Sequence, residues 1–164
     1  MAGKGKAGWL INHNITIYAF RLFCSMEVNQ ALSKEDFIAC WQVMKELRPN
    51  LTEDTYLSLI LHMLDEGYKM IYIKHEDQVA SCCGYRYETQ LHRGKSIYID
   101  DLVTAPTARG KGFGGALLKY VFDEARETGC QSVHLDSGVQ RFAAHRLYLN
   151  NGFNITSHHF ALEL

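Results

Sequence analysis

The sequence predicts one mixed α/β (α+β) domain in which antiparallel strands lead into alternating strands and helices. Runs rich in β-branched and aromatic residues alternate with stretches whose apolar residues recur every three or four positions. These patterns indicate strands and amphipathic helices. Two strand-like runs flank a short polar tetrad, as in a hairpin. The second half then alternates strand and helix patterns, which is typical of parallel strand pairing.

Composition points to a single globular domain. The 164 residues include 17 Lys and Arg against 18 Asp and Glu, and 47% are apolar. We expect residues 1–13 to be a flexible N-terminal tail and residues 14–164 to form the domain. The balanced charge suggests no nucleic-acid partner. Because no stretch has the roughly 18 apolar residues of a membrane span and no signal peptide is visible, we expect a cytoplasmic protein without a membrane partner.

The five cysteines show neither C-x-x-C spacing nor a disulfide framework, so we interpret them as reduced, small apolar residues. Cys82 and Cys83 lie in an apolar strand-like run without a histidine and carboxylate signature, which argues against a cysteine nucleophile. The histidines do not have metal-ligand spacing. We therefore predict no metal site.

The first half is predicted to contain a strand, two helices and a hairpin. A hydroxyl residue suited to helix capping precedes each helical pattern, and proline or glycine ends it. The elements are a strand over 14–21, a helix after Ser33 that stops before Pro49, a helix from Thr52 to Gly67, and strands over 69–74 and 79–87 joined by residues 75–78.

The second half is predicted to alternate between strands and helices. Each helical pattern in it ends at a glycine, which commonly closes a helix. The elements are a loop over 88–95, a strand over 96–104, a helix over 112–128, a strand over 132–136, a helix over 140–151 and a strand over 153–160.

A glycine-rich turn is the strongest chemical signal. Four of the six residues from Gly110 to Gly115 are glycine, and the turn lies between a predicted strand and a predicted helix. Without Cβ atoms the backbone can approach a ligand closely, and the unpaired N–H groups of the first helical turn can bind an anion. Arg109 and Lys111 add positive charge, although Lys111 alone is equally well explained as a solvated side chain. A pyrophosphate suits this turn better than a purely structural role does.

The same glycines also match the dinucleotide fingerprint G-x-G-x-x-G. Gly110, Gly112 and Gly115 have this spacing, and Asp136 follows about twenty residues later. However, residues 105–109 separate the first glycine from the strand, and only about fifty residues follow the turn, too few for a dinucleotide-binding domain. A nucleotide-dependent oxidoreductase is therefore a distant alternative.

Two motifs resemble those of the GNAT acetyltransferases. The segment 109–114 (RGKGFG) matches the acyl-CoA signature [Q/R]-x-x-G-x-[G/A], and the segment 148–153 (YLNNGF) matches a Y-x-x-x-G-F helix ending. The likeness covers residues 97–153. It implies a single-domain GNAT fold, with a mixed, mostly antiparallel sheet whose central strands splay apart between flanking helices. It also implies an N-acetyltransferase that uses acetyl-CoA as co-substrate and attacks it directly in a ternary complex.

The resemblance assigns roles to residues of this chain. Tyr148 matches the family tyrosine that protonates the departing CoA thiolate, the alternative being a tyrosine of the core. The backbone of one strand end is implied to pair with the pantetheine arm, and main-chain N–H groups of the turn are implied to hold the pyrophosphate. The strand residues are Leu102, Val103 and Thr104, and the turn residues are Arg109, Gly110, Lys111, Gly112, Phe113, Gly114 and Gly115.

Asp100 and Asp101 stand together in an apolar strand, where an unpaired carboxylate is costly to bury. Because side chains alternate along a strand, we expect the two to face opposite sides of the sheet, with one of them at the substrate. Asp100 occupies the place where many relatives carry a glutamate. We therefore expect Asp100 to accept the ammonium proton and Asp101 to orient the substrate or hold a loop, and the reverse assignment stays open.

Signals for the acceptor are weaker. Arg141 and His145 share a predicted helical face with Tyr148 and are candidate substrate-binding residues, although many relatives have asparagine where Arg141 stands. The segment 141–148 is similar to aminoalkylphosphonate acetyltransferases, whose substrates carry an anionic end. His158 and His159 are interpreted as polar strand residues.

Three functions follow from these observations. The first is acetylation of a primary amine of a small molecule, and its variant is acetylation of a protein or peptide amine. The second is a non-catalytic acyl-CoA-binding regulatory domain, which Tyr148 and the acidic pair disfavour. The third is the distant oxidoreductase. A homodimer is possible, and the acceptor amine is open.

Overall fold

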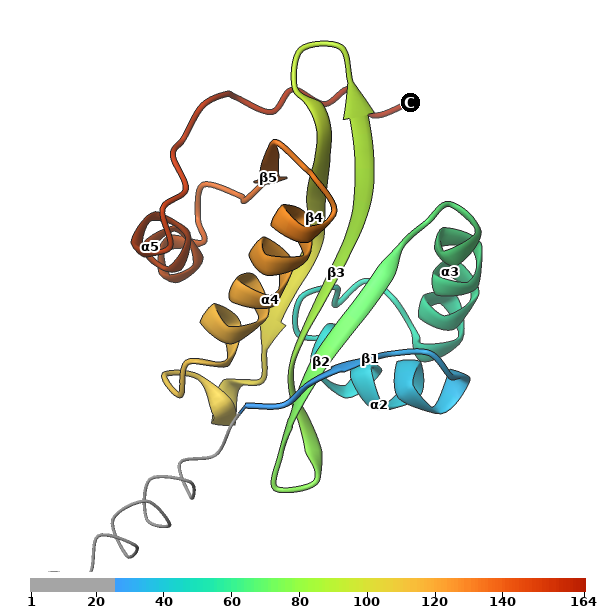
Figure 1. Cartoon of the computed structure of the whole chain (residues 1–164). Helices are drawn as coiled ribbons and strands as arrows, with labels where there is room; N and C mark the ends of the chain where they lie inside the picture. The colour runs from blue at the N-terminus through green and yellow to red at the C-terminus, as the bar shows by residue number, and fades with distance from the viewer. Residues whose placement is uncertain (1–25) are drawn as a thin grey trace, which may run out of the picture.

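The computed structural model describes residues 26–164, which form a five-stranded sheet with helices on both faces (Figure 1). The strands follow the order β1-β2-β3-β4-β5, antiparallel except for the parallel pair β4 and β5. This confirms the predicted mixed, mostly antiparallel sheet. The strand predicted over 14–21 lies outside the described residues. The strands are β1 (Val28–Gln30), β2 (Lys69–His75), β3 (Gln78–Gln90), β4 (Gly94–Thr104) and β5 (Ser132–Leu135).

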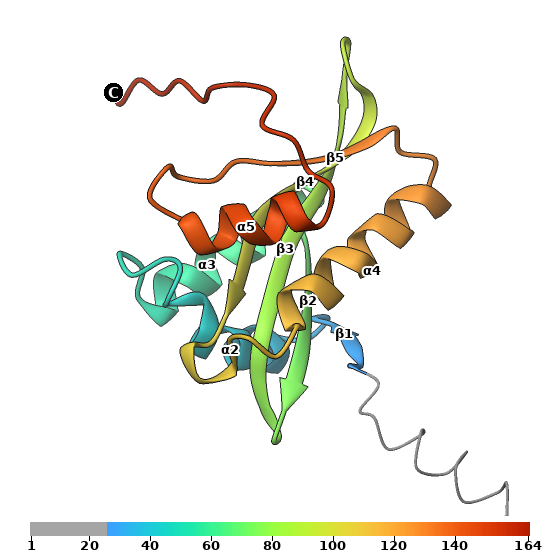
Figure 2. The same cartoon turned by 90° about the vertical axis from the view of Figure 1, so that its left-hand side faces the viewer.

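Helices α2 and α3 cover one face of the sheet, and α4 and α5 cover the other (Figures 1 and 2). A single 3-10 turn, η1, connects β4 to the loop before α4. None of the described helices has both the length and the apolar character needed to cross a bilayer. The helices are α2 (Lys34–Met44), α3 (Glu53–Asp65), η1 (Pro106–Ala108), α4 (Phe113–Glu127) and α5 (Phe142–Asn150).

Both helices of the first half begin at the predicted caps. The Ser33 hydroxyl accepts a hydrogen bond from the Asp36 N–H, and the Asp36 carboxylate accepts one from the Ser33 N–H in return. Thr52 and Thr55 form the equivalent reciprocal pair at the start of α3. These capping boxes satisfy N–H groups that have no partner inside the helix.

Two apolar cores lie on the two faces of the sheet. One joins α2 and α3 to the sheet around Trp41 and Tyr56, whose rings stack with centroids 5.1 Å apart. The other lies under α4, where Leu117, Leu118 and Val121 are fully buried. The sheet is thus covered on both faces, as its apolar strands require.

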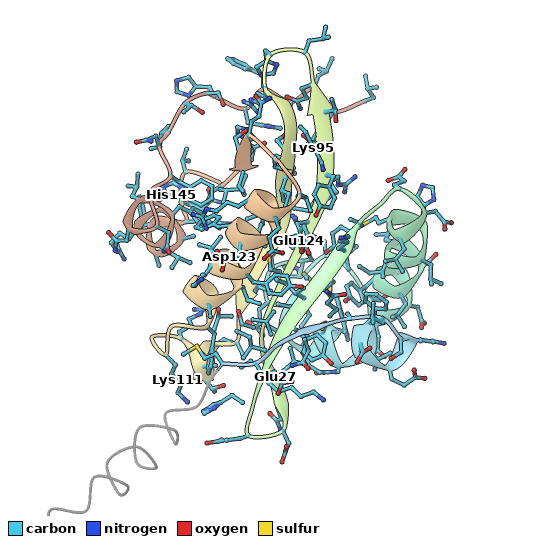
Figure 3. The ribbon with its side chains drawn as sticks, viewed as in Figure 1. Glu27, Lys95, Lys111, Asp123, Glu124 and His145 are labelled. Atoms are coloured by element: carbon cyan, nitrogen blue, oxygen red, sulfur yellow. The ribbon has the colours of Figure 1, made fainter. Side chains whose placement is uncertain are left out.

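Glu124 points from α4 to the sheet and fixes this helix in place (Figure 3). Its carboxylate accepts hydrogen bonds from the hydroxyls of Tyr85 and Tyr87 and pairs with Lys69. Burial raises the pKa of Glu124, but these three donors outweigh it and lower the pKa below the ordinary value. The carboxylate is therefore ionised and holds α4 against β2 and β3.

The β2–β3 hairpin turns at Glu76 and Asp77, both with positive φ (53° and 61°), as a type I′ turn requires. A second hairpin replaces most of the loop predicted over 88–95. Strand β3 extends to Gln90 and β4 begins at Gly94, so only three residues connect them. Cross-strand pairing overrides the polar composition that suggested a loop.

The strand predicted over 153–160 does not form, and no residue after Asn150 belongs to a helix or strand. The alternation of polar and apolar residues is a local property, whereas a strand needs a partner edge. The adjacent edge belongs to β5, which has only four residues. Ile155, Phe160 and Leu162 in this segment are exposed.

Candidate active site

Strand β4 carries a β-bulge at the acidic pair. Asp101 pairs with Gly84 on β3, and the preceding paired residue, Ile99, lies opposite Tyr85. Asp100 is therefore an extra residue without a partner of its own on β3. One extra residue shifts the alternation of faces by one position, so the side chains after the bulge are turned relative to those before it.

The bulge brings both carboxylates to the side of the sheet that α2 and α3 cover. Asp100 accepts hydrogen bonds from Arg86 Nε (3.0 Å) and Nη2 (2.9 Å), and the same guanidinium approaches the end of α3. Asp101 accepts hydrogen bonds from Arg48 Nε (2.9 Å) and the Tyr68 hydroxyl (3.0 Å). The prediction that they face opposite sides is wrong, because strict alternation holds only in a strand without a bulge.

The two aspartates differ in how far they are closed off from solvent. Asp101 is buried, and Tyr68 is buried with it. Asp100 retains 17% exposure of its side chain, on the wall of a pocket. Burial raises the pKa of Asp100, whereas the ion pair with Arg86 acts in the opposite direction without fully offsetting it. Asp101 has the contacts of a structural carboxylate, and Asp100 lies at the site.

Strands β4 and β5 separate directly before the acidic pair of β4. Their pairing ends at Ile99 and Leu135, whereas β4 stays paired with β3 as far as Thr104. The β4 edge over residues 100–104 that points away from β3 therefore has no strand partner in the described part of the chain. Unpaired N–H and C=O groups on such an edge can pair with an extended ligand. This edge includes Leu102, Val103 and Thr104.

The glycine-rich turn opens α4 without a side-chain cap. Gly110 and Gly112 have positive φ (77° and 85°), and Gly112 is the N-cap. Left-handed backbone of this kind suits glycine far better than other residues. The first N–H groups of α4 have no partner within the helix, and the helix dipole adds partial positive charge there.

Lys111 lies in this turn (Figure 3), with its ammonium 3.0 Å from His75 Nε2 on the β2–β3 hairpin. Arg109 donates a weak hydrogen bond to the Thr104 carbonyl (3.4 Å). The tip of this hairpin therefore lies against the glycine turn. Both cationic side chains are exposed beside the turn.

Gly114 and Gly115, at the start of α4, differ in how closely other residues pack against them. A Cβ atom on Gly114 would lie 3.2 Å from Leu147 Cδ2 and 3.7 Å from Thr104 Oγ1, so glycine here lets α4 start close to β4 and α5. A Cβ atom on Gly115 would meet no protein atom within 4 Å. Packing explains Gly114, whereas nothing in the described fold requires glycine at position 115.

A pocket of about 140 Å³ lies where β4 and β5 separate. Of the two predicted substrate-binding residues, Arg141 lines this pocket, whereas His145 lies half-buried on α5 outside its wall (Figure 3). Ser137 also lines it, and the Ser137 Oγ is buried without a hydrogen-bond partner among residues 26–164. The polar residues of the wall are Arg48, Asp100, Asp136, Ser137, Arg141 and Tyr148.

Tyr148 reaches the pocket from the last turns of α5. Its ring packs edge-on against Phe153, with centroids 5.8 Å apart, so the glycine and phenylalanine of the Y-x-x-x-G-F ending bring the chain back under the tyrosine. Burial is the main cause that raises the pKa of Tyr148, and Arg141 opposes it weakly. The hydroxyl is therefore protonated at neutral pH and can donate a proton.

Several residues at this site have no signal in the sequence. Two buried carboxylates need partners, but the sequence does not indicate that Arg48, Arg86 and Tyr68 supply them. The sequence pattern gives His159 only as a polar strand residue, and Asp136 only as the acid that follows the glycines of the dinucleotide fingerprint. In the structure His159 Nδ1 lies 3.0 Å from Asp136 Oδ2, beside the pocket. No group of three or more side chains able to hold a metal occurs among the described residues.

A comparison with models of protein families identifies the family of this chain. The model of the acetyltransferase (GNAT) family matches residues 32–153, which include β4, the glycine turn and Tyr148. The chain belongs to the GNAT acetyltransferase family. It is an N-acetyltransferase in the sense of that family, and the matched range covers all elements that form the pocket.

Individual relatives agree with this membership. An uncharacterized N-acetyltransferase of Bacillus subtilis, YhdJ, is 36% identical over 82% of this GNAT chain and 96% of its own length. The aminoalkylphosphonate N-acetyltransferase of Salmonella typhimurium is 28% identical over 63% of this chain and 68% of its own length. The solved structure of the aminoglycoside N-acetyltransferase AAC(6')-Iy in complex with CoA has a TM-score of 0.74 at 13% identity, over 84% of this chain and 93% of that one.

Proposed function

We propose that this GNAT protein transfers an acetyl group from acetyl-CoA to the primary amine of a small molecule, by direct attack in a ternary complex. The pocket between the separated ends of β4 and β5 carries this proposal. It is small, polar and in contact with Tyr148, and it lies beside a free strand edge. An amine and a thioester that meet there would be held for attack without a covalent enzyme intermediate.

The donor site is proposed along β4 and the start of α4. The free edge at Leu102 to Thr104 is suited to pair with the amides of the pantetheine arm. The backbone N–H groups of the turn from Arg109 to Gly115, which lead into a helix start without a side-chain cap, are suited to hold the pyrophosphate together with the charge of Arg109 and Lys111. The open space over Gly115 supports this placement, because no atom of residues 26–164 occupies it.

The chemistry is proposed to use two groups of β4 and α5. A backbone N–H near Leu102 stabilises the oxyanion that forms when the amine attacks the thioester carbonyl. The Tyr148 hydroxyl then protonates the CoA thiolate as the C–S bond breaks. Asp100 remains the sequence-based prediction for the proton acceptor. In that role Asp100 takes up the proton on an oxygen that already accepts a hydrogen bond from Arg86.

The acceptor is proposed to be a small amine with an anionic group. Arg48 and Arg141 are the two cationic residues of the pocket wall, and Arg141 has no carboxylate partner within residues 26–164. The unpaired Ser137 hydroxyl offers a further polar contact. The aminoalkylphosphonate N-acetyltransferase of Salmonella typhimurium is named for substrates of this kind, which supports the same choice.

A thiol-release assay with acetyl-CoA tests the proposal. The panel contains aminoalkylphosphonates, amino acids with a second anionic group, polyamines, amino sugars and peptides with a free N-terminus. We expect turnover of small anionic amines, and we expect Arg141→Ala to raise their KM by about ten-fold or more, in line with loss of a charged hydrogen bond. Arg146→Ala, on the exposed side of the same helix, is the control. Turnover of peptides alone, or acetyl-CoA binding without any turnover, contradicts the proposal.

A further inference from the structure

Asp100, Asp101 and Asp136 lie at or near the acceptor pocket, and their carboxylates differ in exposure and in hydrogen-bond partners. Asp101 is 10% exposed and engaged by Arg48 and Tyr68. Asp100 is 17% exposed, and Arg86 occupies both of its oxygens. Asp136 is 47% exposed and lines the pocket. A group that accepts a proton needs a free lone pair within reach of the substrate. Asp136 meets that requirement without any rearrangement.

Asp136 is held in place on one oxygen only. It follows Leu135, the last residue of β5 that pairs with β4, just as Asp100 follows Ile99 on the other side of the separation. Its Oδ2 accepts hydrogen bonds from the Tyr98 hydroxyl (2.9 Å) and from His159 Nδ1 (3.0 Å). Its Oδ1 makes no hydrogen bond within the described part of the chain. One oxygen thus fixes the carboxylate, and the other is available to a ligand.

His159 holds this carboxylate from an exposed position. It belongs to the segment after α5, which forms no strand, and its side chain is 67% exposed. Its Nδ1–H donates to Oδ2, as the Tyr98 hydroxyl does, so both contacts that hold the carboxylate fall on one oxygen. The Asp136 side chain is itself 47% exposed, so a proton taken up on Oδ1 can return to water directly.

We propose that Asp136 accepts the ammonium proton of the substrate and releases it to water, while His159 and Tyr98 hold its carboxylate in place. This assignment rests on the proposed function. In the step, an N–H bond of the ammonium breaks and an O–H bond forms on Asp136 Oδ1, which leaves a neutral amine with a free lone pair. The carboxyl proton then passes from Oδ1 to water, because the Asp136 side chain is 47% exposed, and Asp136 returns to its anionic form. Asp136 is the catalytic group, and His159 and Tyr98 position it.

The charges that face Asp136 are compatible with this role. Tyr98 from β4 and His159 from the C-terminal segment contact it directly. Arg141 at the start of α5, Arg48 after α2 and Asp100 on β4 share the pocket wall with it. Oδ1, which accepts no hydrogen bond from residues 26–164, leaves room for the ammonium.

Steady-state kinetics with the amine found for the wild type test the proposal. Asp136→Asn should lower kcat by about 100-fold or more, as expected for loss of a general base, and should leave acetyl-CoA affinity and the thermal unfolding temperature unchanged. It should also remove the ionisation that limits kcat/KM at low pH. His159→Ala should lower kcat by about ten-fold without changing the KM for acetyl-CoA, because the carboxylate loses one of the two donors that hold Oδ2. His159→Gln, which keeps a donor, should retain more of the activity. His158→Ala, at the neighbouring position, is the matched control.

The outcomes separate this assignment from its alternatives. Full activity of Asp136→Asn, or a large loss of kcat in Asp100→Asn with none in Asp136→Asn, overturns the role of Asp136. An unchanged kcat of His159→Ala overturns the positioning role of His159. If Asp136→Asn does not fold, Asp136→Glu keeps the charge and should retain a low-pH limb with a reduced kcat. If the wild type acetylates no amine, the proposed function fails first and this assignment fails with it.

Discussion

Ile99 and Leu135 are the last paired residues of β4 and β5, and the groups of the candidate site follow directly after them. Beyond this pair the two strands separate, so each supplies an aspartate to the pocket between them. Because β4 stays paired with β3, the separation frees one edge of β4 without loosening the strand. A rigid strand with one free edge can position a ligand by its backbone.

Tyr148→Phe should lower kcat by about ten-fold or more, because the phenol is the proposed acid for the CoA thiolate. The ring is retained, so packing against Phe153 should persist and the thermal unfolding temperature should change little. Steady-state kinetics across the pH range measure the effect. Tyr120→Phe, on α4, removes a hydroxyl away from the pocket and is the control. An unchanged kcat would exclude the acid role.

Gly115→Ala should weaken acetyl-CoA binding by about ten-fold while the free protein becomes no less stable. Alanine is a better helix former than glycine by about 1 kcal/mol. No atom of residues 26–164 lies within 4 Å of the position that its Cβ atom would take. A ligand pressed against this backbone would meet the new methyl group. Calorimetry measures the affinity and thermal melting measures the stability, with Glu127→Ala at the far end of α4 as control. Unchanged affinity would place the phosphates elsewhere.

Asp101→Asn should destabilise the fold by about 1–3 kcal/mol, because it weakens hydrogen bonds to Arg48 and Tyr68 in a buried setting. Urea unfolding measures the loss. Tyr68→Phe and the double variant complete a cycle that isolates the pair. Asp123→Asn, an exposed carboxylate on α4 (Figure 3), is the control and should have little effect. A loss in the double variant equal to the sum of the two single losses would show that Asp101 and Tyr68 do not stabilise the fold as a pair.

Asp36→Asn should cost about 1 kcal/mol of unfolding free energy near pH 7, in line with the loss of a helix cap. Burial raises the pKa of Asp36, but hydrogen bonds from Ser33, Leu32 and Tyr72 outweigh it and lower the pKa to about 2 from its ordinary 3.8. A lowered pKa means that the stabilisation is complete above the unfolded value. It should fade as the pH falls from about 4 to 2, below which wild type and variant converge.

This pH dependence is measured by urea unfolding of both proteins at several pH values. Glu35→Gln, an acid in the same helical turn without the capping contacts, is the control. A stability difference that stays constant down to pH 2 would show that the charge of Asp36 does not stabilise the helix.

Several parts of this fold could be predicted from the sequence because they depend on local interactions. The caps at Ser33 and Thr52 and the glycine turn before α4 depend on residues close together in the chain, and all three lie where the sequence placed them. The pattern of a strand, a glycine turn and a helix also carried the family resemblance. In each case the deciding contacts span only a few residues, which the sequence displays directly.

Features that depend on residues far apart in the chain could not be predicted from the sequence. The bulge at Asp100 needs the register of β3, and the alternation rule applied without it placed the two carboxylates wrongly. The predicted strand over 153–160 had a suitable pattern but no partner edge long enough to pair with it. The contact between Asp136 and His159 joins residues 23 positions apart through that irregular segment.

The sequence by itself determined the kind of chemistry: a glycine turn for an anionic donor, a tyrosine before a glycine and phenylalanine, and two acids in a central strand. The tertiary structure decided which groups meet. It paired Asp100 with Arg86 and buried Asp101 beside Arg48. It also left Asp136, on the pocket wall, with one oxygen that accepts no hydrogen bond from residues 26–164. The physical reason is that a carboxylate acquires its role from the donors around it, and those donors come from other strands and helices.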